Sequence, residues 1–184
     1  VDIVPIKHIN TDYAEYRPKL NAEENIMYFT SKRPGGSSDI LDDQGEYYED
    51  IYVSKKKMGV WTEPQLVNDL INTTESSSCL YLSPDGEHMF LSMVNNDQKL
   101  GHLGRGIYEA RLDGNHWNNP EFLDQKVNSK YWETYASLDI YGNVLFFVSD
   151  REGGYGGRDI WMMKKLPSGE WAEPQNLGEP INTE

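Results

Sequence analysis

The sequence predicts an all-β protein built from repeated four-stranded antiparallel sheets, and two observations carry this prediction. Short sequence markers recur along the 184 residues at near-constant intervals, which is the signature of a tandem structural repeat. The chain between the markers consists of short apolar runs broken by Gly and Pro, with no sustained 3.6-residue apolar period of the kind that marks a helix. Each repeat is therefore expected to fold as strands joined by turns.

Three independent markers define the register of the repeat. The Trp-x-x-Pro marker begins at Trp61, Trp117 and Trp171, which places its copies 56 and 54 residues apart. The marker Asp-Ile-Tyr and its variants begin at positions 50, 106 and 159, at intervals of 56 and 53 residues. The marker Ile-Asn-Thr and its variants have four copies, separated by 62, 56 and 54 residues, which begin at Ile9, Ile71, Val127 and Ile181. The agreement of the three sets argues against a chance periodicity.

The middle repeat shows the elements of the unit most clearly. Tight hairpin turns are expected where Gly follows Asp, at 84–86 and 113–114, because Gly adopts the positive φ that such turns require. The apolar runs on either side of these turns predict four strands, at 78–82, 88–92, 106–111 and 117–127.

The first and third repeats follow the same order of elements. Strands at 26–30 and 144–148 correspond to the second strand of the middle repeat, and turns at 23–25 and 141–143 precede them. The strands are apolar on successive residues, so both of their faces are expected to be covered. Four-stranded antiparallel units of this length that are buried on both faces are the blades of a β-propeller.

The expected organisation is a single β-propeller segment over 1–184 with about three blades. The blades are expected at 9–70, 71–126 and 127–180, with 1–8 as the last strand of a preceding blade and 181–184 as the start of a following one. Three blades cannot close a ring, because propellers need about four to eight. The sequence therefore predicts either a longer propeller of about six to eight blades or, as the alternative, a ring completed by a second copy of the chain.

The composition limits the classes of partner. The formal net charge of −13 argues against nucleic acid, because phosphate backbones are bound through basic patches. No apolar run approaches the roughly 18 residues of a membrane span. No signal peptide is recognised at Val1, which fits a processed or excised segment. The single cysteine, Cys79, lies in an apolar strand pattern and is expected to be a buried thiol rather than a nucleophile.

Two sets of motifs carry a resemblance to known families. The run Ser83-Pro84-Asp85-Gly86, followed by an apolar strand, resembles the signature of WD40-like (TolB-like) propeller repeats, as in the periplasmic propeller of the Tol system. The fuller pattern at 28–36 and 147–154, with its following markers, resembles the propellers that precede OmpA-family peptidoglycan-binding domains in envelope lipoproteins, one of them in the type IX secretion machinery. The resemblance implies a periplasmic or outer-membrane-associated protein with a protein or cell-wall-associated partner and no cofactor.

Several repeated residues are expected to stabilise the blades rather than to bind a partner. Arg33 and Arg151 recur in register with Glu15 and Glu133, which predicts an internal ion pair that ties a loop to its blade, in preference to ligand capture. The middle repeat has Met93-Val94-Asn95 at this place and lacks the arginine. The tryptophans of the Trp-x-x-Pro marker are expected to be buried at equivalent positions, namely Trp61, Trp117 and Trp171.

The first repeat carries an acidic insertion at 37–49 that raises the question of a metal site. Asp39, Asp42, Asp43 and Glu46 offer the oxygen ligands that calcium prefers. The spacing departs from an EF-hand loop, however, because Leu41 occupies the third position. A solvated acidic loop is the favoured interpretation, calcium is the alternative, and no metal is predicted.

Partner contacts are expected on the face of the propeller that carries the longer loops. In a blade, the loops after the second and fourth strands emerge on one face, and here the loops after the second strands are long, at 32–49, 94–105 and 150–158. Binding residues concentrate on loops held by a rigid scaffold. The expected contacts are the non-repeated aromatic side chains and the nearby charges of this face, namely Trp132, Tyr131, Tyr155, Arg158, Asp42 and Asp43.

Motifs for catalysis are weak in this sequence. The four histidines show no metal-ligand spacing, and no Gly-x-Ser-x-Gly elbow occurs. Three nearly equivalent blades favour a non-catalytic scaffold that binds a protein or a wall-associated partner in the cell envelope. The alternative is a catalytic propeller, such as a glycan hydrolase or lyase, or a propeller that gates a fused peptidase. The odd acidic loop of the first repeat keeps that alternative open.

Overall fold

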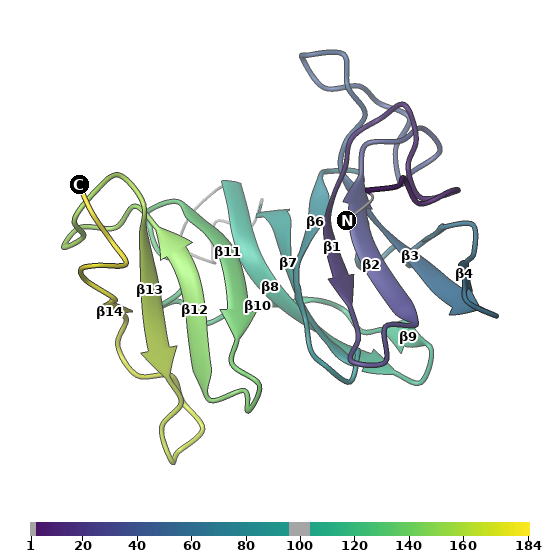
Figure 1. The fold of residues 1–184 in the computed structure, drawn as a ribbon. Helices are drawn as coiled ribbons and strands as arrows, with labels where there is room; N and C mark the ends of the chain where they lie inside the picture. Colours follow the sequence, from purple (N-terminus) through teal and green to yellow (C-terminus); the bar gives the residue numbers. More distant parts are fainter. Residues whose placement is uncertain (1–2, 96–103) are drawn as a thin grey trace.

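The computed structural model describes residues 3–95 and 104–184 and confirms the predicted all-β fold class (Figure 1). These residues form three antiparallel sheets. Among them the structure has no helix of the length and apolar character that a membrane span requires. Most of the expected loop 94–105 falls outside the described residues.

Each sheet is a four-stranded blade with a short additional hairpin strand in two of the three cases. In the first blade the order from the inner edge outward is β1 (Glu15–Leu20), β2 (Ile26–Ser31), β3 (Asp50–Lys57) and β5 (Gln65–Leu66), and β4 (Val60–Trp61) pairs with the end of β3. In the second blade the order is β6 (Ser77–Leu82), β7 (His88–Asn95), β8 (Gly104–Asp113) and β10 (Glu121–Phe122), and β9 (His116–Trp117) pairs with β8. In the third blade it is β11 (Glu133–Leu138), β12 (Val144–Ser149), β13 (Asp159–Lys164) and β14 (Gln175–Asn176).

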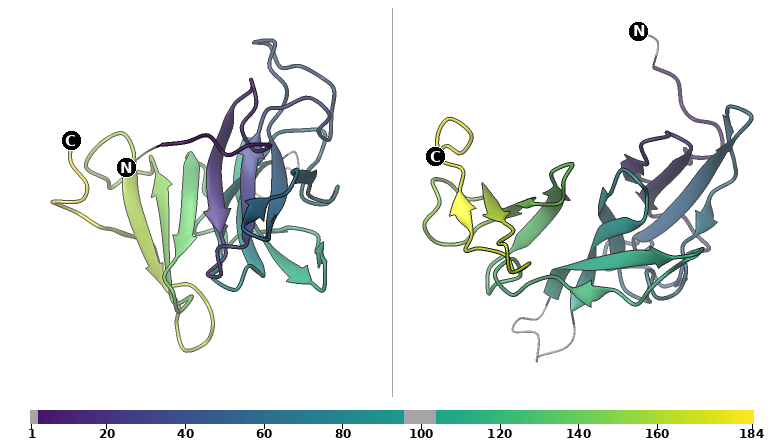
Figure 2. Two further views of the ribbon diagram at one scale, coloured as in Figure 1. Left: turned by 45° about the vertical axis from the view of Figure 1, so that its right-hand side comes forward. Right: turned by 90° about the horizontal axis from the view of Figure 1, so that it is seen from below.

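The blades are arranged as in a β-propeller. Their inner strands β1, β6 and β11 lie next to one another, and the remaining strands of each sheet extend outward from them (Figures 1 and 2). Residues 3–8 form no strand in this chain, so their place in a preceding blade stays a prediction.

The outer strands are shorter than the sequence predicts. The expected strand at 117–127 contains only β10 at its centre, and Trp117 belongs to the hairpin strand β9 instead. Pro120 explains the interruption, because a proline has no N–H to donate to a neighbouring strand.

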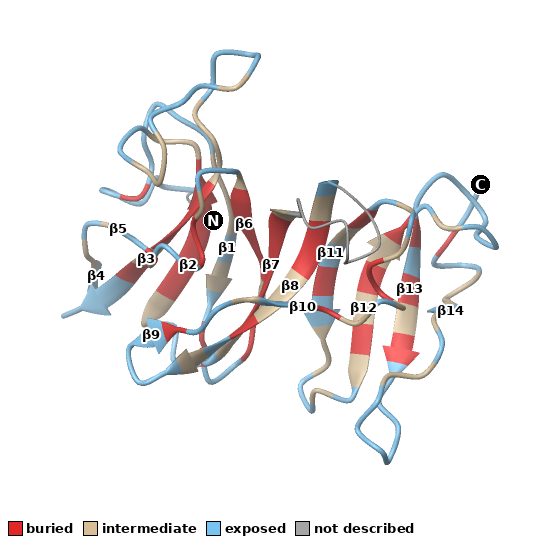
Figure 3. Cartoon of the chain, turned by 180° about the vertical axis from the view of Figure 1, so that it is seen from behind, coloured by how far each residue is buried: buried red, intermediate tan, exposed pale blue. Residues whose placement is uncertain are grey.

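The apolar core lies between the blades, and it explains why successive residues of the second strands are apolar. In β7, Met89 and Leu91 belong to the cluster shared with the first blade, while Phe90 belongs to the cluster shared with the third. Figure 3 shows this burial concentrated in the middle of the strands. Each fully buried side chain of this size contributes about 1.5–3 kcal/mol, so blade-to-blade packing is the main source of stability.

The asparagine of the Ile-Asn-Thr marker is structural. The side chain of Asn128 accepts a hydrogen bond from the Ile107 N–H at 2.8 Å and donates to the carbonyls of Ile107 and Leu123 at 2.8 and 2.7 Å. Asn72 makes the same three bonds in the first blade. Each asparagine therefore ties the third strand of its blade to the segment that leaves the outer strand.

The marker tryptophans are not equally buried, which corrects the prediction. Trp117 is 3% exposed, and its indole N–H donates to the hydroxyl of Tyr28 in the first blade at 3.2 Å. Trp61 and Trp171 are only half-buried. Tyr28 of the preceding blade packs edge-on against Trp117. Trp61 lies in the first blade, beside which the described residues place no preceding blade, and Trp171 packs only partly against the core that the second and third blades share.

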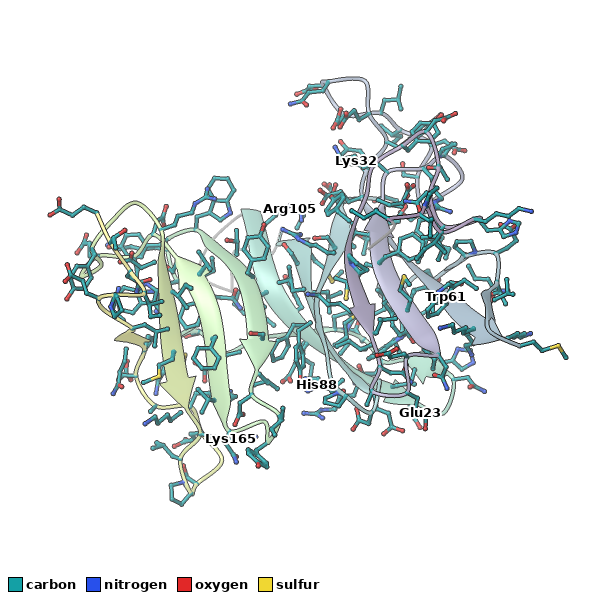
Figure 4. All side chains as sticks on the ribbon, viewed as in Figure 1. Glu23, Lys32, Trp61, His88, Arg105 and Lys165 are labelled. Carbon is teal, nitrogen blue, oxygen red and sulfur yellow. The ribbon has the colours of Figure 1, made fainter. Side chains whose placement is uncertain are left out.

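The two ends of the blades differ as expected. The hairpins between the first and second strands and after the third strands lie at one end, near Glu23, His88 and Lys165 in Figure 4. Lys32, which follows β2, and Arg105, near the start of β8, lie at the opposite end. The acidic loop of the first blade rises above this loop face (Figure 1).

Candidate binding site

The repeated arginines form internal locks, as the sequence predicts. Arg151 donates to the Ser149 hydroxyl at 3.0 Å, to the Val127 carbonyl at 2.8 Å and to Glu133 Oε1 at 3.1 Å. Arg33 makes the same set with Ser31, Ile9 and Glu15, where the arginine–carboxylate distance is 3.2 Å. Both pairs are almost entirely shielded from solvent. The two arginines thus tie a loop to a blade and are occupied by the fold.

The middle blade lacks all three residue types of this lock at the equivalent positions, namely the arginine, the glutamate and the serine. Glu15 pairs with Ser31 across the inner hairpin, and Glu133 pairs with Ser149, but the corresponding pair in the middle blade is Ser77 and Met93. The Ser77 hydroxyl is buried and has no hydrogen-bond partner among the residues that the structure describes. The sequence already indicated that the middle blade lacks the arginine. The structure shows that it also lacks the glutamate and the serine that bind the arginine in the other two blades.

Two of the predicted contacts of the third blade, Trp132 and Arg158, lie against each other on the loop face. Trp132 is 53% exposed, and the guanidinium carbon of Arg158 lies 4.3 Å from the centroid of its ring. Tyr155 is 49% exposed, and its backbone N–H donates to the buried carboxylate of Asp159. Tyr131 is half-buried, with Lys130 Nζ 4.9 Å from the centre of its ring. An exposed indole stacked with a cation is therefore the most prominent feature of this patch.

Two carboxylates of the acidic loop are paired with Lys32. Lys32 Nζ lies 2.5 Å from Glu46 Oε2 and 3.7 Å from Asp42 Oδ2. Asp42 also accepts the backbone N–H groups of Gln44 and Glu46, and these bonds, the one from Glu46 first, lower the pKa of its carboxyl. Asp39 and Asp43 are exposed. No group of three or more metal-ligating side chains occurs within residues 3–95 and 104–184.

Asp42 and Asp43 belong to a different blade from the aromatic patch. The structure therefore divides the predicted contacts into two groups, one at the acidic loop of the first blade and one at the loops of the third (Figure 1).

A polar cluster that sequence reasoning missed lies on the inner strands. Glu49, directly before β3, is engaged by Arg105 of the second blade and by the hydroxyl of Tyr16 on β1. Arg105 also donates to Ser92 on β7 at 3.2 Å. Burial, together with the bond to Glu49, raises the pKa of the Tyr16 hydroxyl far above its usual range, so this group stays protonated.

The second part of this cluster contains one residue from each inner strand. Arg17 of β1 donates from Nη1 to the hydroxyl of Ser78 on β6. The guanidinium carbon of Arg17 lies 4.8 Å from the ring centroid of Tyr135 on β11 and 5.7 Å from that of Tyr16. Arg17 and Tyr135 both have positive φ, 53° and 51°, at irregularities in the pairing of their strands. Such bulges redirect side chains, here toward the inner wall of the propeller.

Cys79 and His88 are shielded or paired. Burial raises the pKa of the Cys79 thiol to about 12, which keeps it protonated and unreactive. His88 Nε2 lies 3.0 Å from Glu109 Oε2 at the hairpin end of the second blade, where its ring packs on Phe90. The arrangement of these groups is typical of packing and pairing rather than of an activated nucleophile.

Comparisons with known proteins find structural likeness at low sequence identity and no family. No protein-family model and no curated protein matches the chain. Solved structures that resemble it at 12% sequence identity include a prolyl endopeptidase (TM-score 0.48), the β-propeller domain of the Trilobed protease from Pyrococcus furiosus (0.48) and a putative TolB from Agrobacterium tumefaciens (0.47). They are matched by 92, 91 and 92% of this chain, which spans 22, 44 and 63% of their own lengths.

The blades themselves define the class of protein. Three four-stranded antiparallel sheets, joined by apolar cores and arranged with adjacent inner strands, make this chain a section of a β-propeller.

Proposed function

We propose that this chain is part of a non-catalytic β-propeller scaffold that binds a protein partner on its loop face, in the envelope of a Gram-negative cell. The observation that carries the proposal is the exposed Trp132–Arg158 pair, with Tyr155 on the neighbouring loop. Exposed aromatic and arginine side chains are the residue types that dominate protein interfaces. Both side chains extend from loops that follow strands of a well-packed blade, so the scaffold holds them in place.

The assignment as a scaffold is supported by how the repeated polar groups are used. The lock arginines and the marker asparagines are satisfied within the blades, so they are not available to a substrate. The acidic loop kept a catalytic alternative open, but two of its carboxylates, those of Asp42 and Glu46, form ion pairs with Lys32. The envelope location rests on the resemblance of the repeat motifs, and separation of periplasm, outer membrane and cytoplasm of the native cell tests it directly.

We further propose that the outer face of the third blade is covered by another blade, either from the same protein or from a second copy. Phe90 of the second blade is 1% exposed and Ile107 is fully buried under the third blade. Their counterparts on the third blade are Phe146, which is half-buried, and Ile160, which is 37% exposed. Sedimentation of the purified chain tests this proposal, because a stable, cooperatively unfolding monomer contradicts it.

The docking proposal is tested by capture of the partner from envelope extracts of the native organism. Arg158→Glu is expected to weaken capture strongly while the melting temperature changes little, because the side chain is exposed and its contact within the described residues is with Trp132. The pair of substitutions Asp42→Lys and Asp43→Lys tests whether the acidic loop belongs to the same interface.

Lys165→Glu is the matched control, since it reverses one exposed charge at the hairpin end of the third blade. If Lys165→Glu abolishes capture and Arg158→Glu does not, the partner binds the opposite face and the proposal is wrong.

A further inference from the structure

Arg17 is held in an unusual place. Its backbone is in the left-handed region at φ 53°, which a residue with a side chain adopts at an energetic cost, and the pairing of β1 with β2 shifts at this point. The side chain is directed across β6, where it bonds to Ser78, and onward to Tyr135 of the third blade. One residue from each of the three inner strands therefore meets at this point of the inner wall.

Most N–H donors of the Arg17 guanidinium have no hydrogen-bond partner within the described residues. An arginine carries five N–H donors in a planar fork, and within the described residues the hydrogen bonds of this one run to Ser78 alone. The ring of Tyr135 lies 4.8 Å from the guanidinium carbon and helps to fix its orientation. An oriented guanidinium with free edges is the geometry that recognises a planar carboxylate through two parallel hydrogen bonds.

Arg17 differs from four of the other five arginines, which are each paired with a glutamate; the fifth, Arg158, is exposed and stacks on Trp132. The sequence has 30 acidic residues against 17 basic ones, and the four paired arginines are Arg33, Arg105, Arg111 and Arg151. Among the described residues no carboxylate lies within ion-pair distance of Arg17, although it is half-buried.

The surroundings of Arg17 strengthen this contrast. Glu49, which accepts a hydrogen bond from Tyr16 beside Arg17, is already paired with Arg105. Lys19, two residues further along β1, has no ion pair in the described chain either. The inner wall thus carries local positive charge in a protein of net charge −13.

We propose that Arg17, oriented by Ser78 and Tyr135 and assisted by Lys19, binds a carboxylate group of a peptide ligand on the inner wall of the propeller. The carboxylate comes either from the C-terminus of a peptide chain or from an acidic side chain. This site is distinct from the loop-face patch, because it is built on inner strands and uses none of the loop residues.

The proposal is tested with the full chain and three short peptide probes. The first is acetyl-triglycine with a free C-terminal carboxylate, the second is its C-terminal amide, and the third is acetyl-Gly-Glu-Gly-amide, which offers only a side-chain carboxylate. Binding is followed by the NMR signals of the arginine Nε–H groups and by calorimetry. We expect at least one carboxylate probe to bind and to shift the Arg17 signal, while the amide probe binds at least about tenfold more weakly. The stronger of the two carboxylate probes identifies the source.

Two variants separate a binding role from a structural one. Arg17→Lys keeps the charge but loses the planar guanidinium, so it is expected to weaken binding of the carboxylate probe about tenfold. Arg111→Gln is the matched control, because Arg111 is exposed and already lies near Glu109, and its loss should leave binding unchanged.

Equal binding of the carboxylate and amide probes, or no shift of the Arg17 signal at millimolar probe, would overturn the proposal and leave Arg17 as a structural bridge between blades. This comparison uses the unaltered chain, so it decides the question even if the Arg17 variant fails to fold. A failed capture experiment with Arg158→Glu would not affect it, since that variant tests the loop face.

Discussion

Replacing Asn128 by Ala is the most direct test of how the blades are held together. The side chain makes three buried hydrogen bonds, one to the N–H of Ile107 and two to the carbonyls of Ile107 and Leu123, all between 2.7 and 2.8 Å. With alanine at 128, the N–H of Ile107 loses its hydrogen-bond partner, and water cannot replace it because Ile107 is fully buried. A buried polar group that loses its partner costs about 1–3 kcal/mol, so the loss of all three bonds is expected to destabilise the chain by about 3–5 kcal/mol.

The measurement is urea unfolding followed by tryptophan fluorescence and far-UV circular dichroism, with coincidence of the two transitions as the test of two-state behaviour. Asn118→Ala is the matched control, because the Asn118 side chain accepts one exposed hydrogen bond, from the Arg111 N–H at 2.8 Å. Its loss should cost less than about 1 kcal/mol. If Asn128→Ala costs no more than the control, the repeated asparagine does not hold the blade together and the reasoning fails.

Three further predictions follow from the packing. Trp117→Ala is expected to cost about 3–5 kcal/mol, and Trp61→Ala clearly less, because only the first is fully enclosed; urea titrations of both variants check the order. Cys79 should not react with a thiol reagent at pH 8 until the chain unfolds, since burial raises its pKa to about 12, and labelling with and without urea measures this. The hydrogen bond from His88 lowers the pKa of Glu109 below its ordinary 4.5, so its contribution to stability is present above that pH and is lost as the pH falls through the lowered folded pKa. His88→Phe should therefore flatten the acid limb of the stability curve, and an unchanged limb contradicts this account.

Much of the fold was predictable from the sequence because each blade repeats the same local chemistry. Turns with Gly after Asp, such as 84–86, mark hairpins in every context, since the requirement for positive φ is local. The marker asparagines recur because every blade has the same backbone groups to satisfy. The burial prediction held for Trp117 and failed for Trp61 and Trp171, because burial of a marker tryptophan depends on what the neighbouring blade supplies, as Tyr28 does for Trp117.

The inner-wall cluster was not predictable for the same reason. Arg17, Ser78 and Tyr135 come from three repeats and do not resemble one another, so a search for repeated residues passes over them. Their relation appears only when the inner strands lie side by side. A comparison of equivalent positions in the three repeats would have found them, because at these positions the residue types differ between the blades.

The middle blade shows how such a difference is accommodated. In the outer two blades an arginine from the loop after the second strand binds the glutamate of its own inner strand, so the lock holds one blade together. In the middle blade the arginine is Arg105, at the start of the third strand, and it binds Glu49 of the preceding blade. The ionic contact has thus moved from within a blade to the junction between two blades. A blade that is enclosed on both sides by apolar cores can lose its internal lock, because its neighbours already fix its strands. The Arg105–Glu49 contact joins the first blade to the second, and Glu49 also accepts the hydrogen bond of Tyr16 on β1.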